Sequence, residues 1–158
     1  STAAGVFRYV PPTTPQGAWD VTCLLVQPTS DIVATDFDGD GKLEILTFSK
    51  FHGDTLAIWH EGQTRDRYEQ VWCDPQKRSF LHALWAADLN GEKCAVIGNR
   101  KDGRDLLLVR YVDGEYTVDV IDHDLGPANC MVYRHDGSDY IVAAYRETDQ
   151  LALYKVVE

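Results

Sequence analysis

Short apolar stretches separated by turn residues run through the whole chain. They are rich in β-branched and aromatic residues, and none keeps the 3.6-residue period of an amphipathic helix. Glycine, proline, asparagine and aspartate bound most of them, which is typical of strands joined by short turns. The pattern therefore predicts an all-β fold.

Three segments of the chain repeat one arrangement, in which a turn containing Gly and Asp joins two apolar stretches. They are residues 31–47, 84–98 and 131–144. A third apolar stretch follows each segment, and a fourth follows the first two. The third stretches are 56–59, 106–111 and 151–156, and the fourth are 68–72 and 116–121. Four antiparallel strands in about 45 to 52 residues are typical of a β-propeller blade.

The predicted strands assign the whole chain to a single array of such repeats. Residues 1–29 contribute the third and fourth strands of a first blade, because 5–9 and 18–26 match those positions. Two full blades and the first three strands of a last blade follow. They are predicted at 30–76, 77–125 and 126–158.

The array amounts to about three blade equivalents, whereas propellers close with roughly four to eight blades. Unpaired strand edges invite pairing with another chain. We therefore expect an incomplete propeller or half of a ring, completed by the remainder of a longer propeller or by a second copy of the chain.

The turn of the first repeat, residues 36–44, reads Asp-Phe-Asp-Gly-Asp-Gly-Lys-Leu-Glu. Ca²⁺ takes six to eight oxygen ligands, and alternating aspartates on a tight loop direct their carboxylates towards one centre. Four carboxylates this close together would repel one another without a cation. The predicted ligands are Asp36, Asp38, Asp40, the backbone carbonyl of Lys42, and Glu44.

Two alternatives to this calcium site are a solvated acidic turn and an EF-hand. An EF-hand needs a bidentate Glu at its twelfth position, which is Thr47 here, and helices on both sides. The flanking residues are predicted strands, so we exclude the EF-hand. The second and third turns carry too few carboxylates to hold Ca²⁺ well, and we expect one structural site.

The loop and its flanking strands resemble the calcium-loop repeats of the FG-GAP/VCBS family, whose pattern is DxDxDGxxD/E. Residues 51–54, Phe-His-Gly-Asp, look like the glycine-containing turn of that family. The resemblance covers the chain as repeats, although only the first repeat keeps the full motif. It implies a β-propeller, as in integrin α-subunit heads, fungal lectins and parts of some sugar-active enzymes. It selects no single function.

The loops on the face opposite the calcium loop carry the candidate ligand-binding residues. These are Lys50, His52, His82, Arg100, Asn129 and Arg146. Such side chains favour a sugar or sugar acid, since Arg binds a carboxylate through two hydrogen bonds. The alternative is structural, with the two arginines paired to recurring aspartates of neighbouring blades. A further basic series, Arg8, His60, Arg110 and Lys155, is interpreted as structural.

Composition excludes some classes of partner. The 158 residues carry a formal net charge of −10, which argues against a nucleic acid as the main partner. No run of ~18 apolar residues exists, so no membrane span is predicted. The four cysteines form no CxxC pair and are expected to be small buried residues. No signal core is visible, so the compartment is not indicated.

The combined pattern favours a calcium-stabilised β-propeller that acts as a binding module, with carbohydrate as the expected ligand. One alternative is part of a sugar-active lyase, dehydratase or isomerase, in which His82 and His52 do acid–base work. The other is a protein-interaction scaffold. The sequence contains no nucleophile elbow, HExxH motif or phosphate-binding glycine loop.

Overall fold

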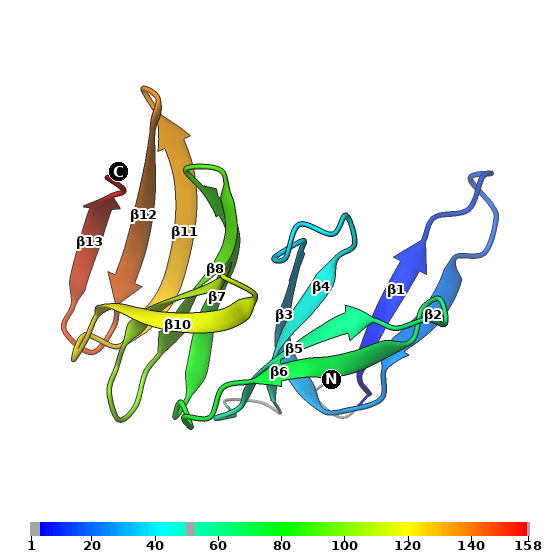
Figure 1. Ribbon diagram of the computed structural model, residues 1–158, viewed down its shortest axis with the longest axis horizontal. Coiled ribbons are helices and arrows are strands. Elements are labelled where there is room, and N and C mark those ends of the chain that lie inside the picture. Colours follow the sequence, from blue (N-terminus) through cyan, green and yellow to red (C-terminus); the bar gives the residue numbers. More distant parts are fainter. Residues whose placement is uncertain (1–3, 50–52, 158) are drawn as a thin grey trace.

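The computed structural model describes residues 4–49 and 53–157, which form thirteen β-strands in four antiparallel sheets (Figure 1). The first sheet contains β1 (Val6–Val10) and β2 (Asp20–Leu25). The second contains β3 (Thr29–Thr35), β4 (Glu44–Ser49), β5 (Leu56–Glu61) and β6 (Tyr68–Cys73). The third contains β7 (Leu81–Leu89), β8 (Glu92–Asn99), β9 (Leu106–Val112) and β10 (Glu115–Asp122). The fourth contains β11 (Pro127–His135), β12 (Ser138–Tyr145) and β13 (Gln150–Lys155). The predicted all-β fold is confirmed.

Strands pair in chain order within every sheet, and the sheets follow one another across the view from β1–β2 on the right to β11–β13 on the left (Figure 1). The first strands of successive sheets lie together, since β3 contacts β7 and β7 contacts β11. The described residues contain no helix that could span a membrane.

Two hydrophobic clusters join neighbouring sheets. One combines residues of the second and third sheets, including Leu46, Ile58, Ile97 and Leu107, and the other combines residues of the third and fourth. The middle strands β4 and β8 are buried on both faces, so their apolar residues run continuously instead of alternating. Packing between sheets thus provides most of the core.

The turn between β9 and β10 has an Asp-Gly pair at its centre. Asp113 and Gly114 have φ angles of 52° and 89°. Positive φ at both central positions matches the twist of the flanking strands, which is why Asp-Gly is favoured in two-residue hairpins. This hairpin brings the end of the third sheet to the same cleft as Asp38 of the β3–β4 loop.

A buried ion cluster also connects the second and third sheets. Arg78, which follows β6, donates to Asp74 at 3.0 Å and to Asp105, which precedes β9, at 3.5 Å. The three side chains are nearly buried. One guanidinium between two carboxylates satisfies several donors at once, so loss of Arg78 would leave buried charges unpaired. The sequence pattern did not indicate this contact.

The four cysteines are free, and their burial differs from the expectation. Cys94 and Cys130 are buried as predicted, and burial raises the pKa of each thiol to about 12. Cys23 is half-buried, while Cys73 at the end of β6 is exposed. The prediction of small buried residues is therefore correct for two cysteines and wrong for Cys73, which sits on an edge strand.

Candidate metal centre

The loop between β3 and β4 is held by its own hydrogen bonds. The backbone N–H of Asp40 donates to Oδ1 of Asp38 at 3.0 Å, that of Gly41 to Oδ2 of Asp36 at 3.0 Å, and that of Lys42 to Oδ1 of Asp40 at 2.8 Å. Gly41 has a φ angle of 88°, which residues with a β-carbon rarely adopt. Each bond fixes one carboxylate oxygen and leaves the other available for a further partner.

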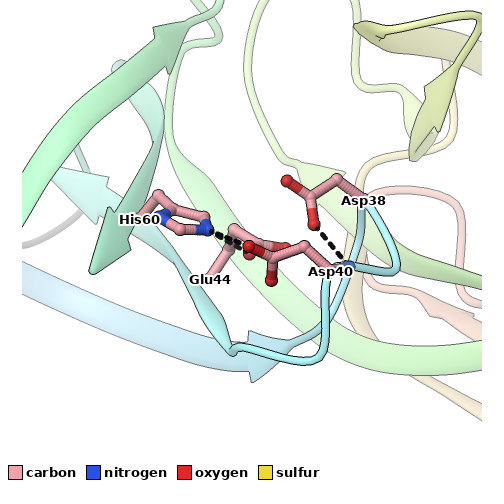
Figure 2. Close-up of side chains that lie close together, drawn as sticks. All are labelled: Asp38, Asp40, Glu44 and His60. Atoms are coloured by element: carbon pink, nitrogen blue, oxygen red, sulfur yellow. Dashed lines mark hydrogen bonds and ion pairs between the residues drawn. The ribbon is translucent and has the colours of Figure 1, made fainter. Parts of the chain in front are cut away.

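Four side chains converge at this loop and are called the metal cluster below. Asp38 and Asp40 come from the loop, Glu44 begins β4, and His60 lies on β5 (Figure 2). One potential ligand atom of each residue lies within 4.8 Å of the others. Three carboxylates and an imidazole at this spacing can hold a metal ion.

Glu44 is the buried member of the cluster, with 0% of its surface exposed. Its Oε2 accepts a hydrogen bond from the N–H of Phe37 at 2.6 Å. Its Oε1 is buried without a hydrogen bond. Burial raises the pKa of Glu44 above its ordinary value, although the bond from Phe37 opposes this. A buried carboxylate oxygen without a donor is costly, and a cation would remove that cost.

His60 presents one particular ring nitrogen to the carboxylates. Its Nδ1 lies 2.8 Å from the carbonyl oxygen of Glu61, which only accepts, so we assign the proton of the neutral ring to Nδ1. Its Nε2 then faces Oδ2 of Asp40 at 3.1 Å and Oε1 of Glu44 at 3.6 Å. A lone pair facing two carboxylate oxygens needs a proton or a metal ion between them. Metal-binding histidines commonly donate their other N–H to such a carbonyl.

The pKa of His60 follows the same contacts. Partial burial lowers it, but the hydrogen bonds with the Glu61 carbonyl and the Asp40 carboxylate outweigh that effect and raise it above its ordinary value. The ring therefore stands in an environment that favours positive charge. That charge can be a proton on Nε2 or a metal ion bound there.

The cluster contains three of the predicted ligands, Asp38, Asp40 and Glu44, together with His60. Asp36 lies outside it, but its Oδ1 is buried without a hydrogen bond, like Oε1 of Glu44. His60, interpreted from the sequence as structural, lies in this cluster and can offer Nε2 to a metal ion. Ile45 pairs with Trp59, and this register places His60 beside Glu44 on the neighbouring strand. A predicted hairpin register for 45–48 and 56–59 would therefore have indicated that His60 lies next to Glu44.

The sequence predicts ligand-binding residues on the loops opposite the metal cluster, and the structure describes four of them. Lys50 and His52 lie outside the described residues. Nδ1 of His82 lies 2.9 Å from the carbonyl oxygen of Ala128, and the ring stacks on Phe80. Asn129 is exposed and accepts a hydrogen bond from the N–H of Cys130.

Arg100 joins the third sheet to the fourth. Its Nε and Nη2 donate to Oε1 of Glu147, in the turn after β12, at 3.0 and 2.7 Å. Its guanidinium lies 4.9 Å from the centre of the Phe80 ring. This contact matches the structural alternative in kind, but the partner is Glu147 instead of a recurring aspartate. Arg146 is exposed.

A cleft of about 590 Å³ lies beside the metal cluster. Asp38 and His60 line it together with Trp72 of β6, Tyr111 of β9 and Tyr116 of β10. It therefore lies where the second and third sheets meet. Its lining combines the polar edge of the metal cluster with aromatic rings from both sheets.

No model of a known protein family matches the chain, and no curated protein matches it. The resemblance of residues 36–44 to the FG-GAP/VCBS calcium loop therefore rests on the motif and the repeat pattern alone.

Proposed function

We propose that this chain is a calcium-stabilised part of a β-propeller that acts as a carbohydrate-binding module. The metal site is supported best by Oε1 of Glu44, a buried carboxylate oxygen without a hydrogen bond among other acidic groups. Ca²⁺ would be held by Asp36, Asp38, Asp40, Glu44 and the carbonyl of Lys42. Bound there, the ion would offset the charges of the β3–β4 loop and stabilise the hairpin.

The propeller proposal is supported by the order of the sheets. Each full sheet has four antiparallel strands in chain order, and the first strands β3, β7 and β11 lie next to one another. The outermost sheets have two and three strands, so β1 and β13 each present an edge that is unpaired within the described residues. Further chain or a second copy would complete these sheets, because open edges readily add strands.

A second candidate cation follows from His60. Calcium prefers oxygen ligands, whereas Mn²⁺ and Zn²⁺ accept a mixture of carboxylate and imidazole. The orientation of His60, with Nδ1 bound to the Glu61 carbonyl, favours coordination through Nε2. A cation of this kind is the alternative occupant of the same site.

The metal proposal is tested by calorimetric titration of the EDTA-treated protein with Ca²⁺, Mn²⁺ and Zn²⁺ in separate experiments. Saturable binding of Ca²⁺ with one ion per chain and a rise in the melting temperature are expected. Stronger binding of Mn²⁺ or Zn²⁺ would favour the alternative cation. Absence of both heat and thermal shift with all three ions would overturn the site. An Asp88→Asn variant, changed in the second turn, serves as the matched control.

The carbohydrate proposal is supported by the cleft, where aromatic rings lie beside carboxylates. A glycan array read with Ca²⁺ and with EDTA tests it, and binding that EDTA abolishes is the expected result. The alternative of a sugar-active enzyme predicts turnover that a His82→Ala variant loses while remaining folded. An interaction scaffold predicts neither glycan binding nor turnover.

A further inference from the structure

The cleft between the second and third sheets has a polar end and an aromatic wall. Asp38 and His60 form the end that borders the metal cluster. Trp72 and Tyr111 contribute rings, and Glu115 adds a carboxylate from the start of β10. Pockets that bind small molecules commonly combine apolar walls with a few convergent polar groups.

The aromatic wall is built on anchored strands. Tyr111 and Tyr116 are cross-strand partners on β9 and β10, and their ring centres lie 4.8 Å apart. The ring of Tyr116 lies 6.0 Å from that of Trp72, which belongs to the other sheet. All three rings are half-buried and pack against the hydrophobic core. The platform therefore needs little ordering when a ligand arrives, which lowers the entropic cost of binding.

The aromatic wall and the metal cluster are electrostatically connected. Burial, followed by the carboxylates of Glu44 and Asp38, raises the pKa of Tyr116 above its ordinary value. The ring of Tyr116 also meets the edge of Phe37, the loop residue whose N–H binds Glu44, at 6.1 Å. A change in charge at the β3–β4 loop would therefore alter the electrostatic environment of the Tyr116 ring.

The charges around the cleft restrict its ligand. Asp38 and Glu115 line it, and Asp40 and Glu44 lie in the adjoining metal cluster, so their carboxylates would repel an anionic ligand. An uncharged ring with hydroxyl groups suits both the aromatic wall and the polar end of the cleft. Its C–H face packs on aromatic rings, and its hydroxyls form hydrogen bonds with carboxylates.

We propose that this cleft is the saccharide-binding site of the module, with Trp72 and Tyr111 as the stacking surface and Asp38 as a residue shared by sugar and ion. The inference rests on the carbohydrate function proposed above and gives it a location on the metal side of the sheets, away from His82 and Arg100. Because Asp38 would contact both ligands, sugar and metal should change the affinity for each other, and by the same factor.

The test uses neutral methyl glycosides of glucose, galactose, mannose and fucose as probes, with saturation-transfer NMR and tryptophan fluorescence as readouts. We expect at least one probe to bind the calcium-loaded chain. The Trp72→Ala variant should weaken that binding about tenfold or more, the loss of one good contact, while calorimetry still detects Ca²⁺. Trp72→Phe should restore part of it, because the ring is retained.

Two further variants keep the test decisive if Trp72→Ala unfolds. Glu115→Gln changes an exposed residue at the start of β10 and should weaken saccharide binding without changing the melting temperature. Trp19→Ala removes an exposed tryptophan from the loop between β1 and β2 and should leave binding unchanged.

The outcomes separate the two proposals. Equal saccharide affinity in the wild type, Trp72→Ala and Glu115→Gln would overturn the cleft as the binding site. The proposed carbohydrate-binding function would remain. No binding of any probe would overturn both. Calcium binding without any coupling to saccharide affinity would remove the shared role of Asp38.

Discussion

The turns that join the first two strands of the second, third and fourth sheets balance their carboxylates in two ways. In the second turn, Oδ2 of Asp88 binds Nζ of Lys93 at 2.7 Å. In the third, the buried Asp139 lies 3.5 Å from Nη1 of Arg134 and accepts a hydrogen bond from the N–H of Asn90 at 2.9 Å. In the first, Oε1 of Glu44 is buried without a hydrogen bond.

The three turns differ in the source of the positive charge that compensates their carboxylates. Two turns supply a cation from the same hairpin, as a lysine or an arginine. The first turn gathers three carboxylates and brings only the imidazole of His60 within reach. Because a buried carboxylate needs a compensating charge or donors, the proposed metal site would give the first turn a cation from solution, which the other two do not need.

The largest expected effect comes from removing the buried charge of the first turn. Ca²⁺ at about 100 times its Kd should raise the free energy of unfolding of the wild type by about 2.7 kcal/mol. The Glu44→Gln variant should lose this response, because its amide cannot replace the carboxylate as a ligand. Chemical denaturation with Ca²⁺ and with EDTA measures both. If Ca²⁺ still raised the free energy of unfolding of the Glu44→Gln variant fully, the proposed difference between the first turn and the other two would be contradicted.

The Asp139→Ala variant should lose about 2 kcal/mol of stability, because the N–H of Asn90 and the guanidinium of Arg134 are left without their partner. The loss should be equal with Ca²⁺ and with EDTA, since this turn carries its own cation. Urea denaturation in both buffers checks this. A loss that appears only in Ca²⁺ would place the third turn in the metal-dependent class.

The His60→Gln variant should discriminate between the candidate cations. Loss of Nε2 should reduce the affinity for Mn²⁺ about tenfold, or about 1.4 kcal/mol, and the affinity for Ca²⁺ less. Calorimetric titration with each ion measures the ratio. His135→Gln, on an exposed histidine of the third turn, is the matched control. Equal losses for both ions would remove His60 from the set of ligands.

The smallest effect is expected at the second turn. Lys93 and Asp88 are both largely solvated, so the Lys93→Ala variant should leave stability and the calcium response unchanged within error. Thermal unfolding of the wild type and the Lys93→Ala variant, with and without Ca²⁺, measures both quantities. A new calcium response in this variant would mean that the lysine had been excluding an ion from the second turn.

Local chemistry accounts for the parts of the fold that could be predicted. The stretches expected at 56–59, 106–111 and 116–121 are strands Leu56–Glu61, Leu106–Val112 and Glu115–Asp122. Their β-branched and aromatic residues and the Asp113–Gly114 turn specify strands and a hairpin within a few residues of chain. The acidic loop was likewise visible because its carboxylates lie close together in sequence.

Contacts between sheets account for what could not be predicted. Arg78 meets Asp105, and Arg100 meets Glu147, across sheet boundaries and over 27 and 47 positions of the chain. No local pattern specifies such partners, since any nearby carboxylate satisfies the same chemistry. The expected pairing of Arg100 with a recurring aspartate therefore had the right type of contact and the wrong residue.

The sequence by itself determined the all-β character, the repeat of four strands and the acidic loop, because each depends on side-chain alternation or turn residues within one hairpin. Only the tertiary structure decided that His60 turns its Nε2 towards Glu44 and that Trp72 meets Tyr116 beside Asp38. Those contacts depend on strand register and on the packing of one sheet against the next, which are set by the whole core and not by neighbouring residues.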